Sequence, residues 1–185
     1  VAPIEQAKKP FIVWGQGVIL GQAEEEFKNF VEKSGIPAAW TILGLSALPT
    51  SHPSNRGMVG MHGNYAPNLL TNQCDLLIAV GMRFDDRVTG DLNTYAKQAK
   101  IIHLELDPSE VNKNVRADVT VLADCKESLK AITEKISSNT YPEWIAEFDR
   151  LDSIEEEKVI YNDLNPTHEG LSMGESIKMI NKHTQ

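Results

Sequence analysis

The stretch Leu76-Leu77-Ile78-Ala79-Val80-Gly81-Met82-Arg83-Phe84-Asp85-Asp86-Arg87 decides the fold. Its first five residues are all apolar, which is typical of a strand buried inside a parallel sheet. A glycine ends the strand, and charged residues follow it directly. In open α/β sheets, ligands bind outside the carboxyl ends of the strands. The stretch therefore predicts a parallel sheet with a binding site where this strand ends.

Apolar runs elsewhere alternate with amphipathic helical patterns, which is typical of βαβ units on a parallel sheet. Helical spacing of apolar residues predicts a helix that begins near Ala23 and stops at Gly35. Another helix is expected after Asp124, which has capping-box spacing with Glu127. A short helix is also expected over 66–73, and further strands over 11–14, 38–41, 101–106, 119–122 and near Met58-Val59. The expected fold class is α/β, a three-layer Rossmann-like domain with a mostly parallel six-stranded sheet.

The character of the chain changes after about residue 137. Residues 1–137 are predicted to form a nucleotide-binding domain, and residues 138–185 a helical linker that enters a further domain. A helix begins near Pro142, because proline is tolerated in a first turn. The charged stretch 152–158 then leads to a short helical pattern over 173–180.

The composition indicates a soluble globular protein, with 185 residues, 41% of them hydrophobic and 24% charged. The formal net charge of −8 argues against a nucleic-acid partner, which requires clustered Lys and Arg. No apolar run approaches the roughly 20 residues of a membrane span, and no signal peptide is recognised. A cytoplasmic location is therefore expected. Cys74 and Cys125 are expected to be reduced thiols rather than a disulfide or a zinc site.

The segment Gly15-Gln16-Gly17-Val18-Ile19-Leu20-Gly21 follows the first strand and opens a helix. Glycines there allow the backbone to approach a phosphate, which a helix N-terminus also favours. The same glycines are equally typical of a tight strand-to-helix turn. The spacing departs from the dinucleotide motif G-x-G-x-x-G, since Leu20 stands at the third glycine position. The second strand ends in Thr41-Ile42-Leu43 without an acidic residue, so a conventional NAD site is disfavoured.

A second glycine-rich segment is Gly57-Met58-Val59-Gly60-Met61-His62-Gly63. Three glycines, a histidine and two methionines suggest a backbone that runs close along a flat ligand. The alternative for His62 is a buried hydrogen bond to the backbone. No serine or cysteine nucleophile with an evident partner accompanies it, so a hydrolytic triad is not expected.

The charged residues that follow the central strand have two interpretations. Arg83 and Arg87 can hold a pyrophosphate, while the carboxylates of Asp85 and Asp86 satisfy them in part. The alternative is a surface ion-pair cluster, which contributes little to stability. Their position at a strand end favours the ligand. Adjacent carboxylates tend to point apart, so catalysis by Asp85 and Asp86 is not expected.

Two further acidic residues lie at strand ends. Glu105 ends the strand over 101–106, where a carboxylate suits ribose hydroxyls or an adenine edge. Asp124 ends the next strand and is expected to cap the helix that follows, with any ligand contact additional.

Together these motifs resemble the middle domain of acetohydroxyacid (acetolactate) synthase large catalytic subunits. The segment 57–63 is similar to that family's L-G-M-H-G, and 80–87 is similar to its G-x-R-F-D-D-R. The strand at 102–108 resembles its H-I-D-I-D, and 123–125 resembles its G-D-x strand end. The order and spacing of the four motifs agree over roughly residues 1–137.

The resemblance implies a domain that binds FAD in an extended form, with the flavin performing no net redox chemistry. It implies a thiamine-diphosphate-dependent transferase that condenses two 2-ketoacids, pyruvate with pyruvate or 2-ketobutyrate, in branched-chain amino acid biosynthesis. No catalytic residue and no metal ligand is expected within this chain. Carried over residue by residue, the FAD contacts are expected at Gly15, Gln16, Thr41, Ile42, Leu43, Val59, Gly60, Met61, His62, Gly81, Met82, Arg83, Phe84, Asp85, Asp86, Arg87, Glu105, Leu106, Asp124 and Cys125.

Two positions depart from the family pattern. The family's glycine triplet is Gly15-Gln16-Gly17 here, and its H-G-T is His62-Gly63-Asn64. The Glu that serves the thiamine ring and the G-D-G-type Mg²⁺ motif do not occur in the chain. The tail at 138–185 is therefore expected to lead into a missing C-terminal thiamine-diphosphate domain, and the chain alone is expected to be inactive. The resemblance also implies a homo-oligomeric parent with a regulatory small subunit.

Three alternatives stand beside this interpretation. One is the middle domain of another thiamine enzyme, of the glyoxylate carboligase or pyruvate oxidase type. Another is a free-standing NAD- or nucleotide-binding module such as a sirtuin-like deacetylase, which needs zinc-binding cysteine pairs that this chain lacks. The third is a purely structural domain that mediates assembly without a cofactor.

Overall fold

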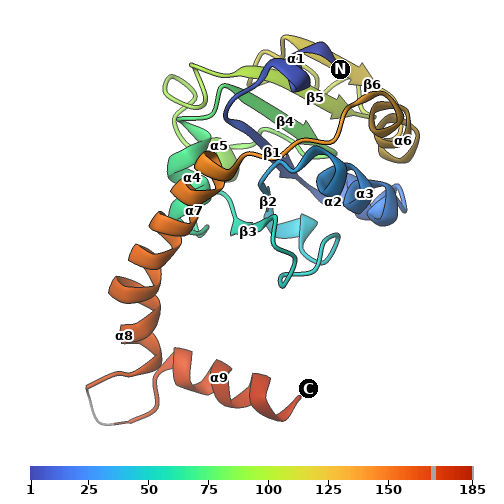
Figure 1. The fold of residues 1–185 in the computed structure, drawn as a ribbon. Helices are drawn as coiled ribbons and strands as arrows, with labels where there is room; N and C mark the ends of the chain where they lie inside the picture. The colour runs from blue at the N-terminus through green and yellow to red at the C-terminus, as the bar shows by residue number, and fades with distance from the viewer. Residues whose placement is uncertain (168–169, 185) are drawn as a thin grey trace.

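Six parallel strands form one sheet in the order β3-β2-β1-β4-β5-β6 (Figure 1). The computed structural model describes residues 1–167 and 170–184. The chain builds the sheet outward from β1 in one direction, crosses over, and continues from β4 in the other, so the strand order reverses between β1 and β4. The strands are β1 (Pro10–Trp14), β2 (Ala38–Trp40), β3 (Asn55–Met58), β4 (Leu76–Val80), β5 (Lys100–Glu105) and β6 (Val119–Leu122).

Helices cover both faces of this sheet, as its buried strands require. The longer helices α3 and α6 pack against each other on one face, and α4 packs against α7 on the other. This arrangement confirms the predicted three-layer Rossmann-like α/β fold. The helices are α1 (Ala2–Gln6), α2 (Gln16–Leu20), α3 (Glu24–Ser34), the 3₁₀ turn η1 (Ile42–Gly44), α4 (Tyr65–Thr71), α5 (Asp86–Thr89), α6 (Cys125–Lys135), α7 (Pro142–Glu155), the π-helical turn η2 (Glu156–Ile160), α8 (Tyr161–Leu164) and α9 (Met173–His183).

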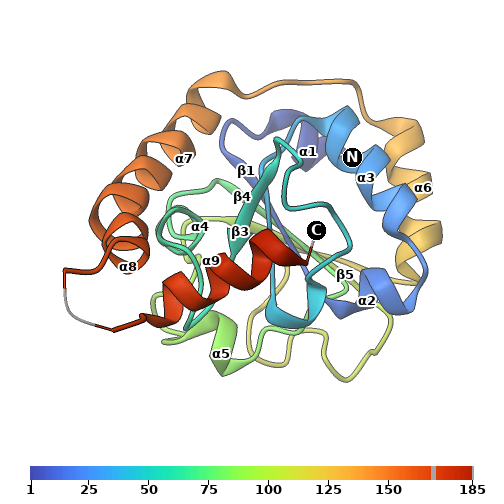
Figure 2. The ribbon, with the colours of Figure 1, turned by 90° about the horizontal axis from the view of Figure 1, so that it is seen from below.

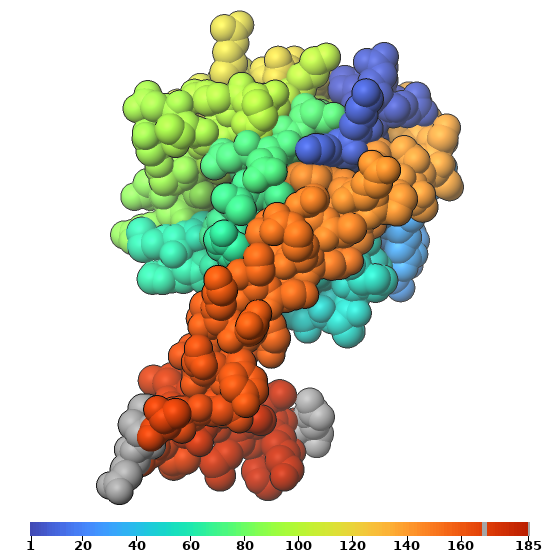
Figure 3. All heavy atoms as spheres, turned by 60° about the vertical axis from the view of Figure 1, so that its left-hand side comes forward, coloured from blue at the N-terminus to red at the C-terminus, as the bar shows by residue number. Residues whose placement is uncertain are grey.

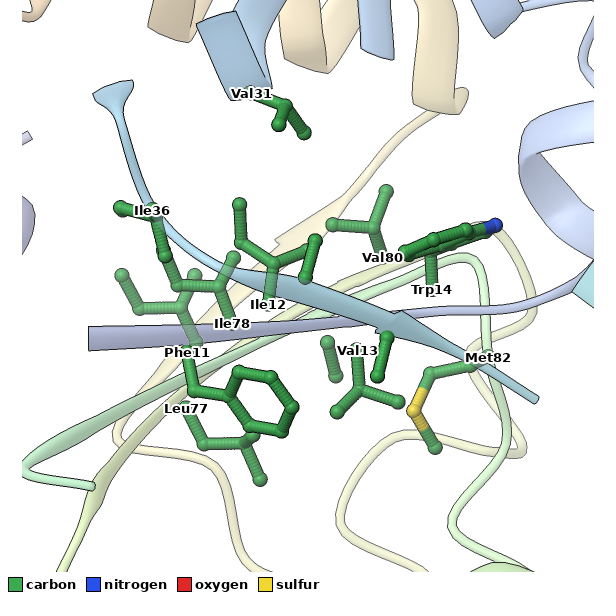
Figure 4. Close-up of a cluster of buried hydrophobic side chains, with 14 of the residues drawn as sticks. Phe11, Ile12, Val13, Trp14, Val31, Ile36, Leu77, Ile78, Val80 and Met82 are labelled. Atoms are coloured by element: carbon green, nitrogen blue, oxygen red, sulfur yellow. The ribbon is translucent and has the colours of Figure 1, made fainter. Parts of the chain in front are cut away.

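The core lies on both faces of β1 and β4, which are buried along their whole length. Successive side chains of β1 point to opposite faces, so Ile12 faces Val31 of α3 while Phe11 faces the other layer (Figure 4). The Phe11 ring lies 5.3 Å from that of Phe148 of α7. The run at 76–80 is apolar throughout because β4 is buried on both faces of the sheet, as the sequence predicts.

The helix that begins at Pro142 belongs to this core. Trp144, Phe148 and Leu151 of α7 are all buried, and the Trp144 indole nitrogen donates a 2.9 Å hydrogen bond to the carbonyl of Pro10. The helix thus ties the end of the chain's main body back to the start of β1. A domain boundary near residue 137 remains a prediction.

Two local expectations differ from the structure, the segment after Gly15 and the capping box at Asp124. The segment after Gly15 forms its own short helix α2, where a glycine-rich loop opening a longer helix was expected. The charged stretch 152–158 is helical and continues α7 through η2 into α8, since its polar side chains are readily solvated on an exposed helix. Asp124 caps α6 as predicted, with its carboxylate accepting from the amide of Lys126 at 2.8 Å, but only Ser172 and Glu175 form a full capping box in the described residues.

The helix α9 lies apart from the sheet, below it in Figure 1 and in front of it in Figure 2. Its apolar side chains Met173, Ile177 and Ile180 are exposed. Over residues 1–167 and 170–184, no helix is both long enough and apolar enough to span a lipid bilayer.

Candidate functional site

A cleft of about 740 Å³ lies at the carboxyl ends of five strands. Residues that end or follow β1, β2, β3, β4 and β5 line it, including Gln16 after β1, Thr41 after β2 and Gly81 after β4. The helices that directly follow β1 and β4, α2 and α5, are visible in Figure 2. Because the strand order reverses between β1 and β4, the cleft occupies the switch point where open α/β sheets bind their ligands.

The floor of the cleft is made by two turns that touch backbone to backbone. The amide of Gly15 donates to the carbonyl of Val80 at 3.0 Å, and the amide of Gly17 donates to the carbonyl of Gly81 at 2.9 Å. A Cβ atom at Gly15 would lie 2.6 Å from the Gly81 oxygen, and one at Gly17 would lie 2.6 Å from the Gly81 Cα. The glycines are therefore required by this contact between turns, as in the strand-to-helix interpretation. The bulkier Gln16 between them is exposed and faces the cleft.

Two asparagines hold the second glycine-rich segment. The side-chain oxygen of Asn64 accepts a 2.9 Å hydrogen bond from the backbone N–H of Met58, and the backbone N–H of Asn64 donates to the Met58 carbonyl at 2.8 Å. Asn68 of α4 bonds both the amide and the carbonyl of Gly60, each at 2.8 Å. Gly60 has a φ of +106°, a conformation that glycine adopts readily and other residues rarely. This bracing turns the side chains of Met61 and His62 toward the cleft.

His62 is exposed and lines the cleft. In the described part of the chain its side chain makes no hydrogen bond, so the alternative of a buried histidine bonded to the backbone is wrong at this position. That arrangement occurs at His103 instead. The His103 ring is fully buried, and its Nε2 lies 2.9 Å from the carbonyl oxygen of Met82, so Nε2 carries the proton. It fixes the turn that carries Arg83 into the cleft.

The predicted charged cluster is found at one side of the cleft. Arg83 and Arg87 are 62% and 72% exposed, and both line it together with Asp85. Asp85 caps the N-terminus of α5, because its side chain accepts a 3.1 Å hydrogen bond from the backbone N–H of Arg87. The ion pairs are loose, with 3.6 Å between Arg83 and Asp85 and 3.9 Å between Arg87 and Asp86. Both guanidinium groups therefore keep donors for an anion.

Two of the predicted contact residues point into the core rather than the cleft. Met82 is 2% exposed and Phe84 is 4% exposed. The Phe84 ring packs edge-on against His103, with 5.0 Å between centroids, and against Tyr95. Their carbonyl oxygens are also engaged within the protein, that of Met82 by His103 and that of Phe84 by the Asn114 side chain.

Glu105 lies at the end of β5 on the wall of the cleft. One carboxylate oxygen accepts from the amides of Leu106 and Asp107 at 2.8 and 3.1 Å, which holds the side chain in place. The other lies 3.7 Å from Nε2 of His103. A fixed carboxylate with a free acceptor is suited to a hydroxyl donor.

The residues of the last predicted strand end lie outside the cleft lining. Cys125 is buried next to Gly81, where a Cβ atom on the glycine would meet the sulfur at 2.9 Å. Burial raises the pKa of the Cys125 thiol to about 11. The thiol is therefore protonated near neutral pH and behaves as a small apolar group. Asp124 serves α6 as its cap.

The cleft thus brings most of the predicted residues together. The predicted residues that line it are Gln16, Thr41, Ile42, Leu43, Val59, Met61, His62, Gly81, Arg83, Asp85, Arg87 and Glu105. Those outside its lining are Gly15, Gly60, Met82, Phe84, Asp86, Leu106, Asp124 and Cys125. Four lining residues were missed, Gly17, Leu20, Met58 and Val88. Their positions inside the two glycine-rich segments and beside Arg87 were the available signal.

Apolar side chains line the cleft beside the charged ones. Leu20, Ile42, Leu43 and Met61 line it although 58–73% of each is exposed. Exposed apolar side chains gathered around a concave site mark a binding surface. Across residues 1–167 and 170–184, no group of three or more His, Cys, Asp and Glu side chains is arranged to hold a metal ion. The cleft is therefore suited to an extended organic ligand with an anionic part and a flat apolar part.

The chain is similar in sequence to acetolactate synthase large subunits. The chain is similar to a probable acetolactate synthase large subunit from Methanocaldococcus jannaschii, with 46% identity over 127 residues, 69% of this chain and 22% of that protein. An acetolactate synthase from Mycobacterium avium is 43% identical over 139 residues, 75% of this chain and 22% of that protein. The large subunit of acetolactate synthase isozyme 2 from Escherichia coli K12 is 40% identical over 144 residues, 78% of this chain and 26% of that protein.

These relatives confirm the resemblance inferred from the four motifs, and the chain spans about a quarter of their length. The family model described as "Thiamine pyrophosphate enzyme, central domain" matches residues 1–132, which is well over half of the chain. The chain therefore belongs to the family of thiamine pyrophosphate enzyme central domains.

Proposed function

We propose that this chain is the FAD-holding central domain of an acetolactate synthase large subunit. The observation that carries the proposal is the cleft at the switch point of the sheet, which two exposed arginines and several exposed apolar side chains line together. Similarity to acetolactate synthase large subunits supports the same assignment.

The chemistry of the cleft fits the parts of FAD. Arg83 and Arg87 supply charge-assisted hydrogen bonds for the pyrophosphate. Glu105 offers a held carboxylate oxygen to ribose hydroxyls, and the apolar side chains of the lining, such as Leu43 and Met61, suit the flat flavin ring. A volume of about 740 Å³ lies within the range of about 300–1,000 Å³ typical of small-molecule sites. In this role the flavin is held rather than reduced.

An NAD site is the competing interpretation, since the strand order 3-2-1-4-5-6 is also that of dinucleotide-binding folds. Leu20 lines the cleft where the NAD motif requires its third glycine, and Thr41 follows β2 where it requires an acidic residue. Both features favour FAD. Titration with FAD and with NAD separates the two, with tighter binding of FAD expected.

The proposal extends to the parent enzyme. It condenses two molecules of pyruvate, or pyruvate with 2-ketobutyrate, in branched-chain amino acid biosynthesis in the cytoplasm. Thiamine diphosphate supplies the carbanion chemistry, with Mg²⁺ holding the diphosphate, and both bind to parts of the parent outside this chain. The parent is a homo-oligomer that takes a regulatory small subunit. The role of the present chain is to hold the FAD scaffold beside that site.

This assignment predicts that the purified chain has no synthase activity of its own. In this proposal the chain contributes the FAD cleft, while other parts of the parent hold thiamine diphosphate and Mg²⁺. We expect no acetolactate above the level without protein when the chain is incubated with pyruvate, thiamine diphosphate, Mg²⁺ and FAD, as measured by the colorimetric acetoin assay. Acetolactate formed in proportion to the concentration of the chain would contradict the prediction.

A further inference from the structure

The tail helix α7 is held against β3 by a stripe of carboxylates. Asp149, Asp152 and Glu155 recur at three-residue intervals, so they lie on one face of the helix. Arg56 of β3 has a side chain only 11% exposed, and it forms a salt bridge with Asp149 and lies 3.6 Å from Asp152. Its guanidinium also sits 5.7 Å from the centroid of the Phe148 ring. Figure 3 shows α7 in orange, lying along the surface beside the green and teal segments of the main body.

The third carboxylate of the stripe contacts the segment that forms one wall of the cleft. The side-chain amide of Asn64 donates to Glu155 at 3.3 Å, while its side-chain oxygen accepts from the Met58 amide at 2.9 Å. Met58 lines the cleft, as do three residues between it and Asn64. One planar amide therefore links the last turn of α7 to the wall.

The side-chain amide of Asn64 packs so closely against Gly57 that no side chain would fit at that position. Gly57 has a φ of +86°, and a Cβ atom there would lie 2.2 Å from the side-chain oxygen of Asn64. The backbone N–H of Asn64 also donates to the Met58 carbonyl, which closes the segment into a loop. Movement of the Asn64 side chain therefore moves the amide of Met58 with it.

We propose that Asn64 is a positioning residue, which transmits the placement of α7 to the cleft wall and so sets the affinity of the cleft for its ligand. The ligand part of this inference rests on the proposed FAD function. Neither Asn64 nor Glu155 lines the cleft, so both act through Met58 and the residues after it. The tail helix contributes to binding without touching the ligand.

The first test uses Glu155→Ala, which removes the acceptor, beside Glu155→Gln, which keeps a carbonyl oxygen for the Asn64 amide. Exchange of the Met58 amide hydrogen, followed by NMR on the ligand-free chain, is expected to be about 3- to 10-fold faster in Glu155→Ala. The FAD dissociation constant is expected to rise by a similar factor. Glu155→Gln should restore both values to near those of the unaltered chain.

The matched control is Glu147→Ala, on the same helix. Glu147 is half-buried, and within residues 1–167 and 170–184 its side chain bonds only Arg150 of the same helix. This variant therefore makes the same change in charge and in helix propensity as Glu155→Ala but removes no contact of Asn64. It is expected to change neither the Met58 exchange rate nor the FAD affinity.

A second variant, Asn64→Asp, keeps the acceptor for the Met58 amide but places a carboxylate against Glu155. Faster exchange is again expected, with recovery in the double variant Asn64→Asp/Glu155→Gln. Unchanged Met58 exchange in both Glu155→Ala and Asn64→Asp would overturn the coupling, whatever the FAD result. Faster exchange with unchanged FAD affinity would overturn the link to ligand binding. Absence of FAD binding by the unaltered chain would overturn the proposed function instead, and the exchange rates would still decide the coupling.

Discussion

Replacing Gly81 with alanine is expected to lower the free energy of unfolding by about 4 kcal/mol, as the sum of two costs. The first is conformational, because Gly81 has a φ of +54°. The second is steric, because a Cβ atom would lie 2.8 Å from the Cα of Gly17 and 2.9 Å from the sulfur of Cys125. Neither neighbour can retreat easily, since Gly17 is bonded to Gly81 through its backbone. Urea unfolding followed by circular dichroism measures the loss.

Gly90→Ala is the control for the conformational cost. Gly90 has a φ of +58°, but a Cβ atom there meets nothing within 4 Å. Its replacement is expected to cost about 1–3 kcal/mol, the conformational part alone. If Gly81→Ala costs no more than Gly90→Ala, the close contact between the turns after β1 and β4 does not contribute as described.

Arg83→Ala is expected to weaken FAD binding by about 10- to 150-fold. A hydrogen bond to a charged group contributes about 1.5–3 kcal/mol, and Arg83 lines the cleft with a side chain that is only loosely paired with Asp85. Because the side chain is 62% exposed, we expect little change in the free energy of unfolding. Flavin fluorescence titration measures the dissociation constant. Added salt should reduce the difference in FAD dissociation constant between the unaltered chain and Arg83→Ala, since salt screens the charge of an exposed arginine.

Arg150→Ala is the matched control for Arg83→Ala. Arg150 is an exposed arginine on α7 that pairs only with Glu147 in the described structure. Its loss removes the same charge from the chain but no donor from the cleft. Equal effects of the two variants on FAD affinity would show that only overall charge matters, and would contradict a pyrophosphate role for Arg83.

The strands of the sheet could be predicted wherever burial requires a continuous run of apolar residues. The run at 76–80 is apolar throughout because β4 is buried on both faces, and its bounds agree with the structure. The edge strand β3 has a weaker sequence pattern, since residues 55–58 are only partly buried. They include Arg56, which forms a salt bridge with Asp149 of α7.

The site was predictable as a set of strand ends but not side chain by side chain. His62 and His103 both follow apolar residues, yet one is exposed in the cleft and the other fully buried beneath it. That difference depends on packing between strands and not on neighbours in sequence. The hydrogen bond between Asn64 and Glu155 could not be predicted either, because the two residues lie 91 positions apart in the chain.

The central claim is that the cleft at the switch point of the sheet binds FAD. The most direct measurement is calorimetric titration of the purified chain with FAD, and in parallel with NAD, at the same salt concentration. The account predicts saturable binding of FAD at one site per chain, tighter than that of NAD, and weakened in Arg83→Ala. Tighter binding of NAD, or binding of neither dinucleotide, would contradict it.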